Sequence, residues 1–354
     1  AFKTAAEING TNAINSGSLD VITTDKTDTK TLVGGFGASL GGGIGGGVAV
    51  TNVKANVAAN VSGTALTTNG NVNVKATADN DTGKTIEVLA LAGGAGLVGI
   101  GAAVSFADIS NNVDANLASG ANAGSGIVTV SAEDKTDIES DAKGAAVGAA
   151  AAGAVYSETS KNSTINAAVG GIITAAAANI SASDSGFIDS LGQSAAGGLG
   201  IGLSGAFVDA SDDSTITALT ASNTTFNLGS GTLNVTATST PQTEAEADGV
   251  AVSGGLAIGA SLADASINTT INASLGASNT VNAGGLNLTA QQLRSGVTDS
   301  AKSTAWAASG GLLLGASATT SDADAIVHVN SRVGDNSTLN LGGGTATVSA
   351  SVDS

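Results

Sequence analysis

A short motif, Gly-x-Val-x-Val-x-Ala or a close variant, recurs along the whole chain and constrains the fold more than any other feature. It appears as GSLDVIT, GNVNVKA, GIVTVSA, GTLNVTA, GLNLTA and GTATVSA, with a weaker copy, AANISA. Taking the second apolar residue of each copy as a mark gives Val21, Val74, Val130, Ile180, Val235, Leu288 and Val348. Successive marks differ by 53, 56, 50, 55, 53 and 60 residues. A near-constant period of this size is typical of stacked repeat architectures.

A second motif keeps the same register. It reads VKANV, VDANL, INAAV, ITAL, INASL and VHVNS, around Ala55, Ala115, Ala167, Ala218, Ala273 and Val329. Two motifs with one period define a single array of about six units of about 54 residues. The approximate units are 17–69, 70–125, 126–176, 177–230, 231–284, 285–343 and a partial unit, 344–354.

Each unit reads as strands and turns. Apolar residues alternate with polar or small ones, and Gly, Asn and Asp punctuate the stretches between them. The Ala-rich run 144–155 has helix propensity, but its equivalents in other units carry Gly at short intervals, so it is predicted to be a strand. The chain is therefore predicted to be all-β, a parallel β-solenoid in which each unit forms two long or three short coils. The alternative is an antiparallel β-array, with a Gly cluster closing a hairpin in each unit.

The composition predicts a thin core. Aromatic residues make up 2% of the chain, and Cys and Met are absent. Ala, Gly and Ser at inward positions would let facing sheets approach more closely than the usual spacing of about 10 Å. Phe106, Tyr156, Phe207 and Trp306 are predicted to fill gaps in this core, and an exposed aromatic strip that stacks on sugars is the alternative.

Charge and cysteine content exclude several classes of function. The net charge is −17, with 29 acidic against 12 basic residues. We therefore expect neither nucleic acids nor anionic membranes as partners, because phosphate binding needs basic patches. The absence of Cys excludes disulfides and thiolate chemistry. The apolar stretch from Leu89 to Phe106 is too rich in Gly for a membrane span, so we expect no membrane insertion.

Acidic residues recur at two places in the repeat. One set follows the first strand of each unit: Asp25, Asp28, Asp79, Asp81, Glu133, Asp134, Asp184, Glu244, Glu246 and Asp299. The other follows the Gly-rich strand: Asp108, Glu158, Asp209, Asp212, Asp213, Asp264, Asp322 and Asp324. Stacking would turn each set into a line of charge, predicted to be a solvated rim. The alternative is Ca²⁺ bridging between loops, with Asp79, Asp81, Asp209, Asp212 and Asp213 as candidate ligands.

The sequence predicts no enzyme and no cofactor. The chain has one histidine, His328, in a strand-like segment where it is expected to face solvent. The Gly-rich runs lack the Lys-Ser/Thr ending of a phosphate-binding loop. We assign no catalytic or cofactor-binding residue.

The recurring GxVxVxA segment, the GGAGLVGIGAAV run (93–104) and the VDANL and INASL segments resemble the repetitive regions of giant bacterial surface exoproteins, such as filamentous-haemagglutinin-like adhesins and autotransporter passengers. The resemblance implies secretion to the cell surface, a β-solenoid shaft, and adhesion or matrix building. We therefore expect a structural and adhesive segment of such a shaft. The alternatives are a self-assembling filament subunit and, third, a glycan-binding module.

The expected partners follow from the same resemblance. Neither end of the sequence shows a polar cap, so we expect continuation into a longer chain or end-to-end association. A host, neighbouring-cell or matrix surface is the other expected contact.

Overall fold

The computed structural model describes residues 2–10, 13–63, 65–80, 85–294, 296 and 300–353. Within these residues every pairing between strands is parallel. The all-β, parallel β-solenoid is thus confirmed, and the antiparallel array is ruled out. Asp81 and Asp299 lie outside the described residues.

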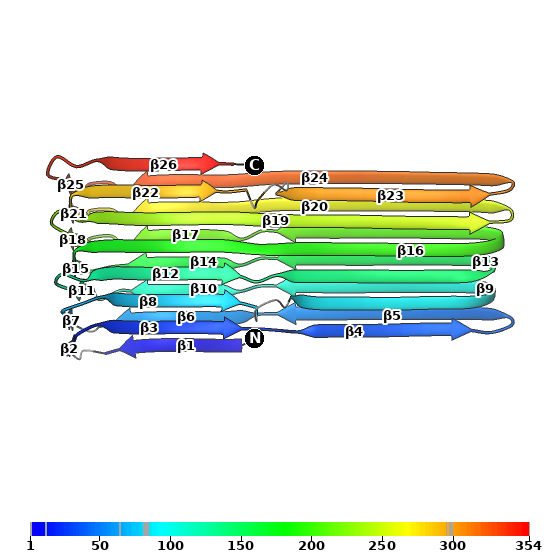
Figure 1. Cartoon of the computed structure of the whole chain (residues 1–354), viewed down its shortest axis with the longest axis horizontal. Helices are drawn as coiled ribbons and strands as arrows, with labels where there is room; N and C mark the ends of the chain where they lie inside the picture. Colours follow the sequence, from blue (N-terminus) through cyan, green and yellow to red (C-terminus); the bar gives the residue numbers. More distant parts are fainter. Residues whose placement is uncertain are drawn as a thin grey trace.

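Each repeat unit forms one large coil, so the prediction of two or three smaller coils is wrong. In Figure 1 the chain runs along an outgoing arm to the far end of the molecule, turns, and comes back along a return arm. It then crosses a short side and begins the next coil. The longest strands run through positions where smaller coils would need corners, because their alternation is not interrupted by turn residues.

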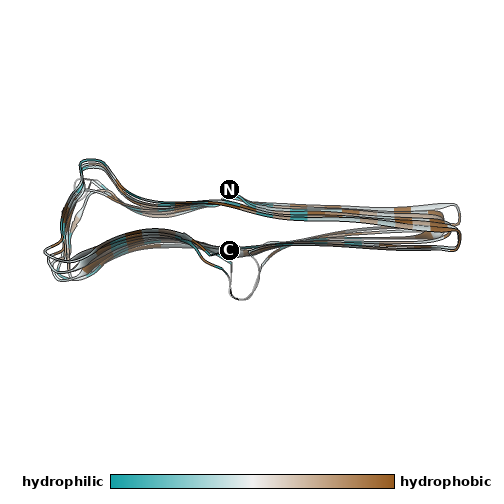
Figure 2. Cartoon of the chain, turned by 90° about the horizontal axis from the view of Figure 1, so that it is seen from above, coloured by the Kyte–Doolittle hydropathy of each residue, from teal (hydrophilic) through white to brown (hydrophobic). Residues whose placement is uncertain are grey.

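Figure 2 looks along the stack and shows two regions, which we call the lobe and the blade. In the lobe the two arms stand apart and the short side joins them. In the blade the arms lie close together as far as the turn, which we call the tip. The waist is the junction between lobe and blade, where Figure 2 marks both ends of the chain.

The strands fall into five groups along the coil. The outgoing arm of the lobe comprises β3 (Leu19–Lys26), β8 (Val72–Asp79), β12 (Ile127–Lys135), β22 (Gly285–Gln292), β26 (Ala346–Val352) and the first parts of β16 (Ala177–Asp212) and β19 (Thr232–Ser253). The outgoing arm of the blade comprises β4 (Lys30–Ala38), β23 (Ala301–Gly311), the first halves of β9 (Ile86–Ile109) and β13 (Ile138–Lys161), the middle of β16 and the second part of β19. The return arm of the blade comprises β5 (Gly42–Val53), the second halves of β9 and β13, the last part of β16, and the first parts of β20 (Leu256–Leu275) and β24 (Leu314–Val333).

The remaining two groups complete the lobe. Its return arm comprises β1 (Phe2–Asn9), β6 (Ala55–Ser62), β10 (Asn112–Leu117), β14 (Thr164–Val169), β17 (Thr215–Thr220) and the last parts of β20 and β24. Its short side comprises β2 (Ala13–Ser16), β7 (Ala65–Thr68), β11 (Ala121–Asn122), β15 (Ile172–Thr174), β18 (Thr225–Asn227), β21 (Thr280–Asn282) and β25 (Thr338–Asn340).

The register of the stack follows the first motif. All seven marks are direct partners in one ladder, from Val21 through to Val348. The second motif is right in its middle copies, where Ala115, Ala167, Ala218 and Ala273 form a ladder. At its ends it is wrong: the ladder continues to Ala59 and Ser331, not to Ala55 and Val329. In the first unit, VAAN around Ala59 resembles the motif as closely as VKAN does, and composition does not separate them.

The lobe has the usual polarity of a β-solenoid. Three sides enclose a core of Val, Ile and Leu side chains, and the ring of Phe226 is fully buried on the short side. Outside, polar side chains stack from coil to coil. Asn234 Nδ2 donates to Asn179 Oδ1 at 2.8 Å, and Asn287 Nδ2 donates to Asn234 Oδ1 at 2.9 Å. These amide ladders add hydrogen bonds that depend on the same register as the core.

The blade reverses the usual placement of large and small side chains. Near the waist Ile86, Val88, Val155 and Val208 still pack between the arms. Toward the tip the inward positions carry mainly Gly, Ala and Ser, and the two arms approach until backbone meets backbone. A Cβ on Gly101 would lie 2.2 Å from the carbonyl oxygen of Ala145, and one on Gly35 would lie 2.0 Å from that of Gly46. The predicted close approach of the sheets is therefore present, and it is confined to the blade.

Large apolar side chains of the blade face outward. On the return arm they form ladders such as Ile44–Ile100–Ala152–Leu203–Ile258 and Val48–Val104–Tyr156–Phe207–Leu262. The prediction that the aromatic residues fill the core is wrong for all four of them. Phe106, Tyr156 and Phe207 lie on the outer surface of the return arm, and Trp306 lies on the opposite, outgoing face. No room remains for a ring between two arms in backbone contact.

The waist contains a buried charged cluster. Lys161 is 1% exposed and its Nζ donates to Asp184 Oδ1 at 2.7 Å. Asp134 is the ladder neighbour of Asp184, and Asp212 is that of Lys161. Asn111 Nδ2 donates to the Asp134 carboxylate at 3.2 Å. The positive charge of one lysine thus faces three carboxyl groups between the arms.

These three acids correct the predicted rim. Asp134, Asp184 and Asp212 were expected on the solvated edge, but they face the interior and are buried. Burial raises the pKa of Asp184 and of Asp212, although Lys161 lowers it. Burial lowers the pKa of Lys161, but the three carboxyl groups outweigh it and the net shift is upward. Lys161 is therefore charged, and the cluster depends on it for compensation.

Candidate binding groove on the blade

A groove crosses the outgoing face of the blade, perpendicular to the strands. Phe36 lies at one side, and its ring covers Gly93, where a Cβ would come within 2.3 Å of Phe36 Cδ1. In the same ladder, Ala145 and Ala195 follow on the next two coils and Val250 on the one after. Small side chains therefore form the floor between Phe36 and Val250. The volume of the groove is about 450 Å³.

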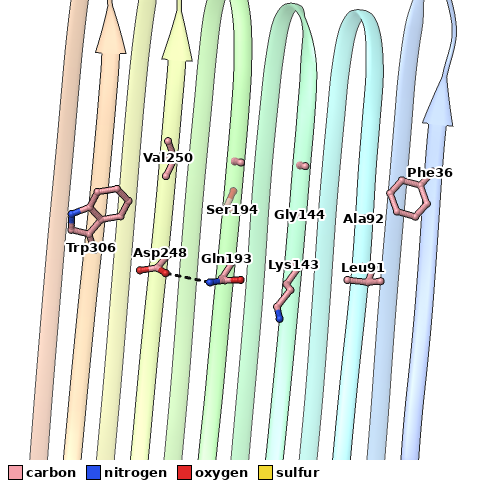
Figure 3. Close-up of a pocket in the computed structure, with 12 residues that line it drawn as sticks. Phe36, Leu91, Ala92, Lys143, Gly144, Gln193, Ser194, Asp248, Val250 and Trp306 are labelled. Atoms are coloured by element: carbon pink, nitrogen blue, oxygen red, sulfur yellow. Dashed lines mark hydrogen bonds between the residues drawn. The ribbon is translucent and has the colours of Figure 1, made fainter.

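A second ladder runs beside the first and supplies polar groups. It contains Leu91, Lys143, Gln193, Asp248 and Trp306, one residue for each coil. Figure 3 shows Trp306 at one end of this row and Phe36 at the other end of the groove, with the polar side chains between them. Gln193 Nε2 donates to Asp248 Oδ2 at 3.4 Å. The arrangement is an apolar floor with aromatic ends and a short file of hydrogen-bonding groups.

Both aromatic side chains are available to a ligand. Phe36 is 78% exposed and Trp306 is 53% exposed. Lys143 lies between them and pairs with Asp141 at 2.8 Å, with its side chain still partly in solvent. Sites of this kind, mostly apolar with a few convergent polar groups, are the usual form of small-ligand and chain-ligand sites.

An acidic row lies on the waist side of the groove, four residues along the strands from the polar ladder. In register it contains Lys30, Glu87, Glu139, Asp189, Glu244 and Lys302. Ion pairs join Lys30 to Glu87 and Lys302 to Glu244 at its two ends. Burial raises the pKa of Asp189 to about 7, with Glu244 and Glu139 adding to the shift. The middle of the row therefore carries closely spaced carboxyl groups that repel further negative charge.

The return face of the blade carries a second, smaller hollow of about 300 Å³. Its wall is the ladder Tyr156–Phe207–Leu262, and its border is a ladder of acids, Glu158, Asp209, Asp264 and Asp322. The predicted line of charge therefore exists for these four residues. Burial raises the pKa of Asp209 and of Asp264, and neighbouring acids of the ladder add to it. Burial and the hydrogen bond to Glu158 raise the pKa of Tyr156 to about 12.

The candidate calcium ligands do not converge. Asp79 lies in a ladder between Lys26 and Lys135, on the outgoing arm of the lobe. Asp212 faces the waist interior, and Asp213, the next residue, faces outward, where its carboxylate accepts from Asn268 Nδ2 at 3.1 Å. Asp209 lies on the return face of the blade. Across the described ranges, no group of three or more His, Cys, Asp or Glu side chains is arranged to hold a metal ion.

His328 is exposed on β24. The part of the chain that the structure describes contains no helix able to cross a membrane.

Sequence reasoning missed most of the groove. Trp306 was singled out but assigned to the core, and Phe36, Lys143, Gln193 and Asp248 were not singled out at all. A signal was present, because counting inward positions along β5 from Val53 places Gly47, Gly45 and Gly43 inside. The same count places large residues outside.

Comparison with known proteins returned no match: no family model, no curated protein and no solved structure is similar to this chain.

Proposed function

We propose that the chain is a non-enzymatic, extracellular structural and adhesive repeat segment, part of the shaft of a long bacterial surface exoprotein. The observation that carries this proposal is the apolar outer surface of the blade, which is repeated from coil to coil on a parallel stack. Contiguous exposed apolar surface marks an interaction site. The resemblance of the repeat motifs to surface exoproteins supports the same class.

The coil is much longer across the solenoid axis than the stack is along that axis, so the design gives wide faces rather than a long rod. Parallel strands lie about 4.8 Å apart, so the five steps from β4 to β23 advance only about 24 Å along the axis. The outgoing arm from Ile127 to Val147, at about 3.3 Å per residue, covers about 70 Å. A shaft of this design is a broad ribbon whose faces, rather than its length, account for most of the residues.

Charge supports an extracellular ribbon that stays dispersed. The net charge is −17, and acidic ladders border the apolar surfaces on both faces of the blade. Such borders repel nucleic acid, anionic lipid and, at low salt, other copies of the chain. Adhesion is thereby restricted to partners that meet the apolar surface directly.

A second candidate function, a self-assembling filament subunit, is favoured by one observation. On the return face, the two ladders of large side chains flank a ladder of small ones: Gly46, Ala102, Ala154, Gly205 and Ala260. A ridge on one copy fits such a furrow on another, as in the dry interfaces between paired sheets. Copies would then associate through blades.

Location and assembly are tested on the native material. Antibodies against the chain should label intact, unpermeabilised cells, and external protease should remove the label; an epitope found only after lysis would overturn the proposal. Electron micrographs should show flat ribbons with a strand repeat of about 4.8 Å along the ribbon. Single ribbons support the shaft, whereas ribbons paired through their wide faces support the filament subunit.

A further inference from the structure

We propose that the groove between Phe36 and Trp306 binds a neutral, extended glycan of the β-1,4-linked type, lying along the solenoid axis. This inference goes beyond the adhesive role. It rests on the proposed function only for the extracellular location in which the chain would meet the ligand. It assigns a ligand class to one surface of the blade.

The ladder geometry fits a chain of sugar rings. The groove crosses the strands, so each coil contributes its side chains at intervals of about 4.8 Å. A pyranose ring in an extended glycan occupies nearly the same length, so successive rings meet equivalent positions on successive coils. The Ala145 and Ala195 floor leaves space for rings that lie flat on the sheet.

The chemistry of the walls fits the two faces of a sugar. Phe36 and Trp306 offer exposed aromatic surface to the axial C–H groups of the terminal rings. Between them, Lys143 supplies donors, Asp248 supplies acceptors and Gln193 supplies both, which suits hydroxyl groups that donate and accept. This spacing of apolar and polar groups favours a glycan over an apolar chain, which would displace water from the three polar side chains without offering them hydrogen bonds.

Charge selects among glycans. Asp248 lies in the groove, Asp141 and Glu246 lie two residues closer to the waist, and the acidic row with Glu139 and Asp189 follows two residues further on. Sulfated or uronic acid chains would be repelled by these carboxyl groups. A β-1,4 linkage keeps successive rings in an extended ribbon that follows a flat sheet, whereas an α-1,4 linkage curves the chain away from it.

Trp306 is the only tryptophan in the chain, so its fluorescence reports on the site directly. Cellohexaose and chitohexaose are titrated into the purified full chain, with maltohexaose and a heparin hexasaccharide as comparison ligands. We expect saturable change in Trp306 emission with at least one β-1,4 hexamer, and binding about tenfold or more weaker for maltohexaose and heparin. Calorimetry on the same samples checks that the signal is binding.

Variants test the assignment to the groove. Ala195→Leu fills the exposed floor without touching the core, and should weaken binding at least tenfold. Phe36→Ala should weaken it about tenfold, the loss expected when an aromatic contact worth about 1.4 kcal/mol is removed. The matched controls lie on the opposite face: Ala154→Leu in the small-residue furrow and Phe207→Ala beside it. Circular dichroism of each variant confirms the fold.

The possible results are decisive. No saturable response to either β-1,4 hexamer at millimolar concentration overturns the proposal, and so does an equal loss in the controls on the return face. Tighter binding of heparin would overturn the charge argument and with it the ligand class. None of these results affects the surface labelling or the ribbons that test the adhesive role, so the two proposals fail separately.

Discussion

The lobe and the blade are built from successive segments of the same coils, and strands such as β16 and β19 run through both. Toward the tip, however, the blade places large and small side chains on the opposite faces from those in the lobe. In β16, Ile180 faces the lobe core, whereas Gly192 and Ala196, at inward positions of the same strand, face the blade interior. The short side holds the arms of the lobe apart, so the space between them needs large side chains. The blade has no third side and its arms close until backbones touch. The distance between sheets, rather than hydrophobicity, decides which residues are inside.

The difference also separates two uses of apolar residues. In the lobe they stabilise the stack, because they leave water when the chain folds. In the blade most large apolar side chains remain partly exposed, so they contribute less to folding and more to the character of the surface. We infer that the lobe fixes the register and that the blade provides the contact surface.

The largest expected effect lies at the waist, where the two regions meet. Lys161→Met removes the charge that compensates Asp134, Asp184 and Asp212 in a buried site. Breaking a buried charged cluster in this way costs about 3–5 kcal/mol, so the free energy of unfolding should fall by that amount. Urea titration measures it. The matched control is Lys143→Met, an exposed lysine on the same strand, which should change the value by less than about 0.5 kcal/mol; similar losses for both would show that the cluster is not the cause.

The next effect tests the closed interior of the blade. Gly101→Val places side-chain atoms where the Ala145 carbonyl already lies, and that backbone is held by its own ladder. Overpacking of this kind should lower the free energy of unfolding by about 3 kcal/mol. Ala102→Val, the adjacent outward position, should be close to neutral. If both variants are tolerated, the arms are not in backbone contact, and the contrast with the lobe disappears.

A smaller effect comes from the acidic row on the blade, through Asp189. The pKa of Asp189 in the folded chain is about 7, raised from 3.8, so the folded state holds a proton that the unfolded state has released. The stability that this bound proton gives to the folded state is therefore present at about pH 4, and it is lost as the pH rises through about 7. Allowing for its contact with solvent, the loss is about 1–2 kcal/mol.

Comparison of wild type with Asp189→Asn isolates this contribution. Urea midpoints at pH 5 and pH 8 should differ more for the wild type than for the variant, with the variant the more stable at pH 8. Parallel curves for the two proteins would mean that Asp189 titrates normally and that the row is better solvated than its burial indicates.

Much of the register could be predicted from the sequence, because stacked parallel strands repeat their pattern wherever one face is buried. The marks from Val21 to Val348 succeed for this reason. The number of coils per unit could not be predicted, since a period gives the length of the repeat unit but does not show where the chain turns corners within it. At the tip, Gly–Leu pairs such as Gly96–Leu97 turn the chain without Asn, Asp or Pro.

Which side chains of the blade face inward was harder to predict, because the alternation of large and small residues is the same whichever face is inside. Only a count carried along an unbroken strand from a buried apolar residue near the waist, as from Val53 along β5, reveals it. The buried lysine has a comparable signal: aligned units place Lys161 beside Ile109 and Asp212, so one position is apolar, basic and acidic in turn. Treating every acid as a loop residue concealed this position.

The smallest expected effects compare the outer surfaces of the two regions. Asn234→Ala removes two amide hydrogen bonds from the lobe ladder and should lower the free energy of unfolding by up to about 1 kcal/mol. Leu203→Ser removes an exposed apolar side chain from the blade and should change it by less than about 0.5 kcal/mol. Urea titration measures both, and light scattering at increasing concentration follows association. If the blade is the contact surface, Leu203→Ser alone lowers association while stability stays constant; a fall in stability as large as that of Asn234→Ala would instead make the outer ladder of the blade part of what holds the stack together.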